Sequence, residues 1–294
     1  MREYISQRQR EDVVIKVSMF GQLTIHVDER ALGRRDLGGV KPRQLLAMLL
    51  LQRRPVTKDE LIDALWEEKA PRDPVATLEA YVSVLRSSLQ PGVRREHSVI
   101  ATEPGAYYFV RERAFIDVDQ FDLLTRRLGA ANTAERRAAL VEACALATGP
   151  VLEDERYAEW ALGPRRHYER MRLEALVAAA DMHVEEGIAR DALDLAERAM
   201  IIDPTCEPAY HAAMRAASVL GRRDMVRSFY DQCARSMRNE LGVSPMAVTA
   251  NLRDELLQDS AEERRLVGAA VGALWSPAME HQAVDTVWPS SRFR

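Results

Sequence analysis

Cysteine is scarce in this sequence, and the three that it has lie far apart. Cys144, Cys206 and Cys233 show no metal-ligand spacing and no Cys-x-x-Cys pair, and their odd number does not suit a disulfide framework. We expect them to be small buried apolar residues. Aromatic residues are also few, at 6% of the chain, which favours a helix-rich core packed by leucine and alanine.

Long apolar runs are missing as well. No stretch approaches the ~18 residues that a membrane-spanning helix needs, and the polar start MREYISQRQREDVV has no signal-peptide core. The sequence therefore predicts a cytoplasmic protein with no membrane partner. Its 294 residues give room for about two domains.

Motifs of catalysis and metal binding are also absent. The sequence contains no HExxH, no P-loop and no GxSxG. Asp117, Asp119 and Asp122 lack the glycine and the distal glutamate of a calcium loop, and the six histidines are scattered. These absences predict a protein that is not an enzyme, with no catalytic residues, no metal and no cofactor.

Charge is nearly balanced, with a formal net charge of −4. The chain up to Val110 is weakly net positive and the remainder is net negative. A positive N-terminal part has the right sign for nucleic-acid binding, although the charge difference is small. Basic clusters occur at several places, and each fits either a nucleic-acid contact or a solvated surface: Arg34-Arg35, Lys41/Arg43, Arg53-Arg54 and Arg94-Arg95.

The stretch from Thr57 to Leu89 predicts two helices joined by a tight connector. Thr57 can cap the first helix, and Glu60, three residues later, can reach back and complete a capping box. Apolar residues at helical spacing follow, and the helix should end before Pro71, because proline disfavours α geometry in the residue before it.

A second helix is expected from Pro74, with Asp73 as its N-cap. One stripe of this helix is apolar and consists of Leu78, Val82, Leu85 and Leu89. The opposite face carries small and hydroxylic side chains, namely Thr77, Ala80, Ser83, Val84 and Ser87, with Arg86 on the flank. Such a face lets a helix approach a partner closely, as in the recognition helix of a helix-turn-helix. An ordinary amphipathic helix on a solvated surface is the alternative.

Residues 98–111, SVIATEPGAYYFVR, predict a β-hairpin after these helices. Two β-prone runs flank the turn signal Pro104-Gly105. Ahead of the helices, β-prone segments at 13–19 and 23–27 predict a small antiparallel sheet, and Val40 to Arg53 predicts a helix opened by Pro42. Helices followed by a hairpin in this order predict a winged helix.

From Phe121 onward the pattern is almost wholly helical. Helices are expected at 121–128, 134–147, 157–186, 189–202, 207–220, 224–241 and 246–257, with Gly163-Pro164 as a candidate break or kink. Gly187 and Gly221 are 34 residues apart in the sequence, which is the tetratricopeptide period. The small residues of that repeat's second helix match Ala192, Ala196 and Ala199. A generic helical bundle is the alternative.

Taken in order, these segments resemble a known family. VSMFGQLTIHVDERAL, DLGGVKPRQLLAMLLLQ, VTKDELIDALW, ATLEAYVSVLRSSL and IATEPGAYYFV look like the DNA-binding domain of the Streptomyces antibiotic regulatory proteins, and the recognition helix is similar to that of OmpR-type response-regulator effector domains. FDLLTRRL, LEDERYAEWALGPRRHYERMRLEAL and GRRDMVRSFYDQCARSMRNELGVSP resemble the bacterial transcriptional activation domain of the same regulators.

The resemblance implies a mainly α fold with two domains. A winged helix-turn-helix DNA-binding domain with small antiparallel sheets would occupy 13–113. An all-α, tetratricopeptide-like activation domain would occupy 115–258. Residues 259–294 lie outside the resemblance and are expected to form a tail, in which 261–275 could form one further helix.

The implied function is a sequence-specific activator that binds direct repeats in double-stranded promoter DNA and recruits RNA polymerase holoenzyme. The resemblance further implies a homodimer or side-by-side protomers on DNA, and control of a specialised-metabolite (antibiotic) gene cluster. Two alternatives remain: a helical-repeat adaptor whose winged helix binds protein, and a repressor of the same architecture.

The resemblance also implies the site residues. The DNA contacts would be Lys41, Arg43, Thr77, Ala80, Ser83, Val84, Arg86, Ser87, Thr102 and Gly105, and the polymerase-facing loop would comprise Glu67, Glu68, Lys69 and Arg72. Val84 departs from the family, whose members usually carry arginine there. A valine cannot make a bidentate guanine contact but can touch a thymine methyl group, so the operator is expected to differ or specificity to be weaker.

Overall fold

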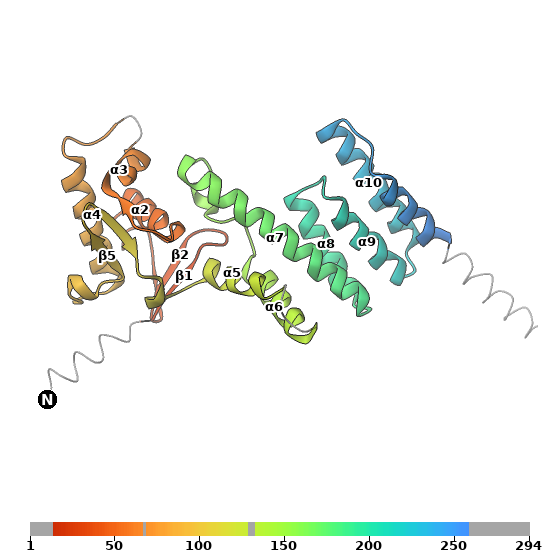
Figure 1. The fold of residues 1–294 in the computed structure, drawn as a ribbon, viewed down its shortest axis with the longest axis horizontal. Helices are drawn as coiled ribbons and strands as arrows, with labels where there is room; N and C mark the ends of the chain where they lie inside the picture. Colours follow the sequence, from red (N-terminus) through yellow and green to blue (C-terminus); the bar gives the residue numbers. More distant parts are fainter. Residues whose placement is uncertain (1–13, 67–68, 129–132, 259–294) are drawn as a thin grey trace, which may run out of the picture.

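The computed structural model describes residues 14–66, 69–128 and 133–258. Figure 1 shows an elongated molecule, with small sheets and helices at the N-terminal end and a row of helices beyond them. The predicted fold class, mainly α with a winged helix in front of a helical domain, is confirmed. The predicted tail at 259–294 lies outside the described residues.

The first sheet has four strands in the order β3-β2-β1-β7. The strands β1 (Ile15–Ser18) and β2 (Thr24–Val27) are antiparallel, as the sequence predicts, and β3 (Arg30–Leu32), which was not predicted as a strand, pairs antiparallel with β2. The fourth strand, β7 (Ala114–Ile116), pairs parallel with β1 and was not predicted, because three residues are too short for an alternating pattern to stand out.

The winged helix follows the predicted order. It contains α2 (Val40–Leu51), α3 (Lys58–Trp66) and α4 (Pro74–Leu89), and a second sheet of β4 (Val56–Thr57), β6 (Ala106–Phe109) and β5 (Ile100–Glu103). The hairpin β5–β6 is the wing.

The predicted capping residues are confirmed. The amide of Glu60 donates to the Thr57 hydroxyl at 3.2 Å, and the amide of Thr57 donates to the Glu60 carboxylate at 2.9 Å, which is the reciprocal capping box. Asp73 caps α4 by accepting from the amide of Ala76 at 2.9 Å. These caps fix where α3 and α4 begin, and so fix the turn between them.

The second region is a row of helices. They are α5 (Asp117–Arg127), α6 (Thr133–Leu146), α7 (Glu159–Glu185), α8 (Ala189–Ile202), α9 (Glu207–Val219) and α10 (Arg223–Leu241), followed by helical residues 247–258. Consecutive helices from α7 to α10 pack on one another, and α7 also packs on α9. Gly187 and Gly221 sit at equivalent turns with φ of +76° and +68°, a conformation that favours glycine.

The candidate break at Gly163-Pro164 was wrong, because α7 runs through both residues. Pro164 lies in the second turn, where its missing N–H removes one backbone hydrogen bond. Burial of one face along a helix of 27 residues outweighs that loss.

Among the described residues, no helix is both long and apolar enough to cross a bilayer.

The two regions share one hydrophobic core. Phe20, from the loop after β1, packs edge-on against Phe121 and Tyr168 of the helical region, with ring centroids 5.1 and 5.9 Å away. The loop around Phe20 also pairs with the segment before α7: the amide of Gly21 donates to Pro150 O, and the amide of Leu152 donates to Met19 O. This pairing fixes the helical region against the first sheet.

Candidate nucleic-acid interface

The helix α4 has one face in the core and one face free. Its predicted apolar stripe is fully buried, and Ala80, Ser83 and Ser87 on the opposite side are exposed. Thr77 is half-buried, and its hydroxyl donates to Asp73 O at 2.7 Å. In Figure 1, α4 forms one end of the molecule, with α2 and α3 between it and α7. The helical region therefore leaves this face of α4 uncovered.

Val84 is partly exposed, at 39%, and also packs against the loop before α2. Gly38 in that loop has φ of +84°, and a Cβ atom placed on it would lie 2.7 Å from Val84 Cγ1. The hydroxyl of Ser88 reaches the same loop and donates to Asp36 O. The loop thus needs glycine at position 38, and it limits how far the Val84 side chain can turn.

Arg86 links α4 to the wing. Its Nε and Nη2 atoms donate to Ile100 O at 2.9 and 2.7 Å, and Nη2 also donates to Thr102 Oγ1 at 2.7 Å. Burial, and to a smaller extent the nearby cation Arg95, lower the pKa of Arg86. Much of its hydrogen-bonding capacity is therefore already used within the protein, which sequence analysis could not indicate.

The wing tip is open to solvent. Thr102 is exposed beside Arg86, and Gly105, with φ of +73°, makes the tight turn and accepts at its carbonyl oxygen from the Lys58 amide at 2.9 Å. The Lys58 ammonium contacts Glu79 of α4 at 2.5 Å, and this hydrogen bond raises the pKa of Lys58. Contacts from α3 and α4 thus hold the wing in place.

The two predicted phosphate contacts at the start of α2 are engaged elsewhere. Arg43 forms a salt bridge with Asp154 of the helical region, with only 13% and 15% of the two side chains exposed, and it also donates to Leu23 O. The ammonium of Lys41 donates to Leu65 O at the end of α3. Arg43 therefore lies at the junction of the two regions, and we leave it out of the proposed DNA contacts.

Other basic residues near the wing also bind the helical region. Arg111 makes two hydrogen bonds of 2.7 Å to Asp119 of α5 and one of 2.6 Å to Leu50 O of α2. Arg53, from one of the basic clusters, pairs with Asp119 and Asp122. Arg53 and Arg111 are far along the chain from Asp122 and Leu50, respectively, so no local pattern in the sequence indicates these two contacts.

Asp117 at the start of α5 has a structural role. Its carboxylate accepts from the amides of Met19, at 2.9 and 2.8 Å, and Phe20, at 3.0 Å. Its burial raises its pKa, against the effect of these hydrogen bonds. The described residues contain no group of three or more His, Cys, Asp or Glu side chains placed to hold a metal.

The connector between α3 and α4 is described in part. Lys69 and Arg72 are exposed, and the amide of Lys69 donates to Trp66 O at 2.8 Å. Glu67 and Glu68, the other two residues of the predicted polymerase-facing loop, lie outside the described residues.

Cys144 and Cys233 are buried, as predicted, and burial raises the pKa of each thiol to about 11, while Cys206 is half-buried.

Comparison with known proteins agrees with this architecture. Residues 38–110 match the family described as "Transcriptional regulatory protein, C terminal", and residues 116–257 match "Bacterial transcriptional activator domain". The regulatory protein AfsR of Streptomyces coelicolor is 30% identical over 231 residues, which cover 75% of this chain and 22% of AfsR. The AfsR of Streptomyces griseus is 29% identical, with 79% and 24% covered. The chain thus spans about a quarter of the length of these relatives.

A mycobacterial regulator matches a larger share of its own length. The transcriptional regulatory protein EmbR of Mycobacterium bovis is 27% identical over 75% of this chain and 58% of EmbR. The structure of Mycobacterium tuberculosis EmbR in complex with a low-affinity phosphopeptide has the same fold, with a TM-score of 0.70 at 23% identity, covering 88% of this chain and 70% of that one.

The winged helix and the row of helices behind it define a transcriptional regulator. The chain belongs to the Streptomyces antibiotic regulatory protein family.

Proposed function

We propose that this regulator is a sequence-specific activator that binds direct repeats in promoter DNA and recruits RNA polymerase. The α4 face with Thr77, Ala80, Ser83, Val84 and Ser87 would enter the major groove, and the wing around Thr102 and Gly105 would lie along the adjacent backbone. Antibiotic or other specialised-metabolite genes are the proposed targets, on the basis of the AfsR relatives.

One observation carries the proposal: α4 buries its apolar stripe completely, and on its opposite face Ala80, Ser83 and Ser87 are exposed and left uncovered by the helical region. Small side chains allow close approach to base edges, and hydroxyl groups can serve as donors or acceptors there. Lys69 and Arg72 are exposed in the connector that precedes α4 in the chain, and we propose that this connector contacts the polymerase while α4 is on DNA.

The test is a gel-shift titration of the whole chain against promoter fragments from the gene's own neighbourhood, at two salt concentrations and with nonspecific competitor DNA. The whole chain is needed because β7 and Asp117 complete the first sheet from beyond the winged helix. A discrete, salt-dependent complex with a repeated footprint would support the proposal.

Other outcomes identify the alternatives. Absence of DNA binding even at low salt would favour an adaptor whose winged helix binds protein. A footprint that overlaps the core promoter and lowers transcription in a reconstituted assay would identify a repressor of the same architecture. If substitution of Lys69 and Arg72 abolishes transcription activation but leaves DNA affinity unchanged, that result would support polymerase contact by the connector.

A further inference from the structure

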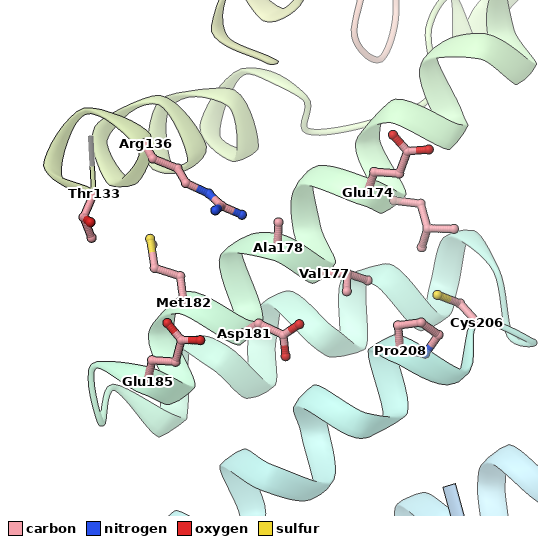
Figure 2. A pocket seen from close by; sticks show the side chains of 11 residues that line it. Thr133, Arg136, Glu174, Val177, Ala178, Asp181, Met182, Glu185, Cys206 and Pro208 are labelled. Carbon is pink, nitrogen blue, oxygen red and sulfur yellow. The ribbon is translucent and has the colours of Figure 1, made fainter. Parts of the chain in front are cut away.

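The helical region carries an open groove that the DNA-binding proposal does not use. The groove has a volume of about 700 Å³ and lies between α6, α7 and the start of α9. This volume falls in the range of ~300–1,000 Å³ that is usual for ligand sites. Figure 2 shows α7 running along the groove, with Thr133 and Arg136 of α6 on one side and Cys206 and Pro208 on the other.

The floor of the groove is apolar and comes mainly from one face of α7. Leu173, Val177, Ala178 and Met182 line it and are half-buried, so part of each side chain remains open to solvent. Covering these side chains with another apolar surface would be favourable by ~25 cal/mol per Å² of buried apolar area. The floor therefore suits the apolar face of a peptide segment.

The charges around this floor are unequal. Three carboxylates of α7, from Glu174, Asp181 and Glu185, line the groove, and Arg136 is the single cation among the lining residues. Asp181 is partly neutralised by Arg215 at 3.3 Å, whereas Glu174 and Glu185 are exposed, and the nearest cation to Glu174 is Arg170 at 4.0 Å. The α7 side of the groove therefore keeps a net negative charge.

We propose that this groove binds an amphipathic segment of a partner protein whose apolar side chains are flanked by lysine or arginine. Its apolar face would cover Val177 and Met182, and its cations would pair with Glu174 and Glu185. These two glutamates are eleven positions apart, which is about 16 Å along a helix axis. A helical segment must therefore span about three turns, whereas an extended segment would cover the same length with ~5 residues.

The position of Arg136 determines on which side of the groove the cations of a bound segment would lie. Figure 2 shows its side chain reaching from α6 towards α7, across the groove from the carboxylates. A bound segment would therefore place its cations on the α7 side and keep them away from α6. Replacing Arg136 by glutamate should strengthen binding of a basic segment, whereas reversing the charge of Glu174 and Glu185 should weaken it.

The experiment uses the whole chain and a fluorescent 15-residue helical peptide of leucine, alanine and lysine, with the leucines on one face and the lysines beside them. We expect saturable binding in fluorescence anisotropy, weakened about tenfold by the double variant Glu174→Lys/Glu185→Lys. Arg136→Glu should tighten binding severalfold. Raising the salt concentration should weaken binding of all forms, because exposed charges are screened.

Glu197→Lys/Glu240→Lys is the matched control, because it changes the net charge equally at exposed positions of α8 and α10 outside the groove. An equal loss in this control would overturn the proposal, since the peptide would then respond to net charge alone. Binding of the same peptide with glutamate in place of lysine, or no binding of the lysine peptide, would also overturn it. Circular dichroism melts verify that each variant is folded.

Discussion

The guanidinium of Arg86 in α4 and the carbonyl oxygen of Ile100 in the wing are joined by two hydrogen bonds, at 2.9 and 2.7 Å. This pair of hydrogen bonds, called the Arg86 fork below, fixes the wing against the helix that we propose enters the major groove. Arginine suits the position because its planar donors can engage one acceptor twice and still reach the hydroxyl of Thr102. The sequence placed Arg86 among the DNA contacts, and the structure gives it a bracing role as well.

Replacing Arg86 by alanine should lower both stability and DNA affinity. Loss of the fork leaves Ile100 O without its partner, at a cost of ~1–3 kcal/mol in the free energy of unfolding. With the wing no longer held, DNA affinity at fixed salt should fall more than tenfold, which urea titrations and gel shifts would measure. Arg86→Lys keeps the charge without the fork, so wild-type behaviour of this control would contradict a bracing role.

Val84→Arg should change the operator that the protein prefers. An arginine on the exposed face of α4 can make a bidentate guanine contact, worth ~1–3 kcal/mol of discrimination. Selection from a random DNA library should then enrich guanine at one position of each direct repeat. Val141→Arg is the control, because that valine is 47% exposed on α6 and should add only nonspecific affinity. Identical preferred sites for wild type and Val84→Arg would remove Val84 from the proposed interface.

Arg43 and Lys41 should respond differently to substitution. Arg43→Met breaks the salt bridge to Asp154 in a poorly solvated junction, so it should destabilise the whole chain, by ~3 kcal/mol if the pair behaves as fully buried. The salt dependence of DNA binding should not change. Lys41→Met should lower the salt slope by about one unit if the ammonium turns from Leu65 O to a phosphate. If Arg43→Met also lowers the slope of the salt dependence of DNA binding, Arg43 contacts DNA.

The capping box of α3 should be sensitive to acid. Hydrogen bonds from Arg54, and then from Thr57, lower the pKa of Glu60 from 4.5 to about 2. A lowered pKa in the folded state means that the stabilising contribution is present above pH 4.5 and is lost as the pH falls towards 2. The stability difference between wild type and Glu60→Gln should therefore shrink over this interval in urea titrations. Asp59→Asn, in the same helical turn, is the matched control, and a difference independent of pH would contradict the assignment.

Local signals along the chain were enough to predict the winged helix. The capping box at Thr57 and Glu60, the Asp73 cap and the Pro104-Gly105 turn each involve residues within three positions of one another, so local chemistry fixes them. The buried stripe of α4 follows from helical spacing in the same way. Even the turns at Gly187 and Gly221 were visible as a period in the sequence.

The tertiary structure alone decided which charged residues are available at the surface. Arg43 and Asp154, or Arg53 and Asp122, are far apart along the chain, and no local pattern marks them as partners. The same holds for β7, which joins the first sheet only because the folded chain returns beside β1. Residue types and local spacing determine helices, caps and turns, because these depend on near neighbours. The free or paired state of a cation depends on the whole packing arrangement, because its partner can come from anywhere in the chain.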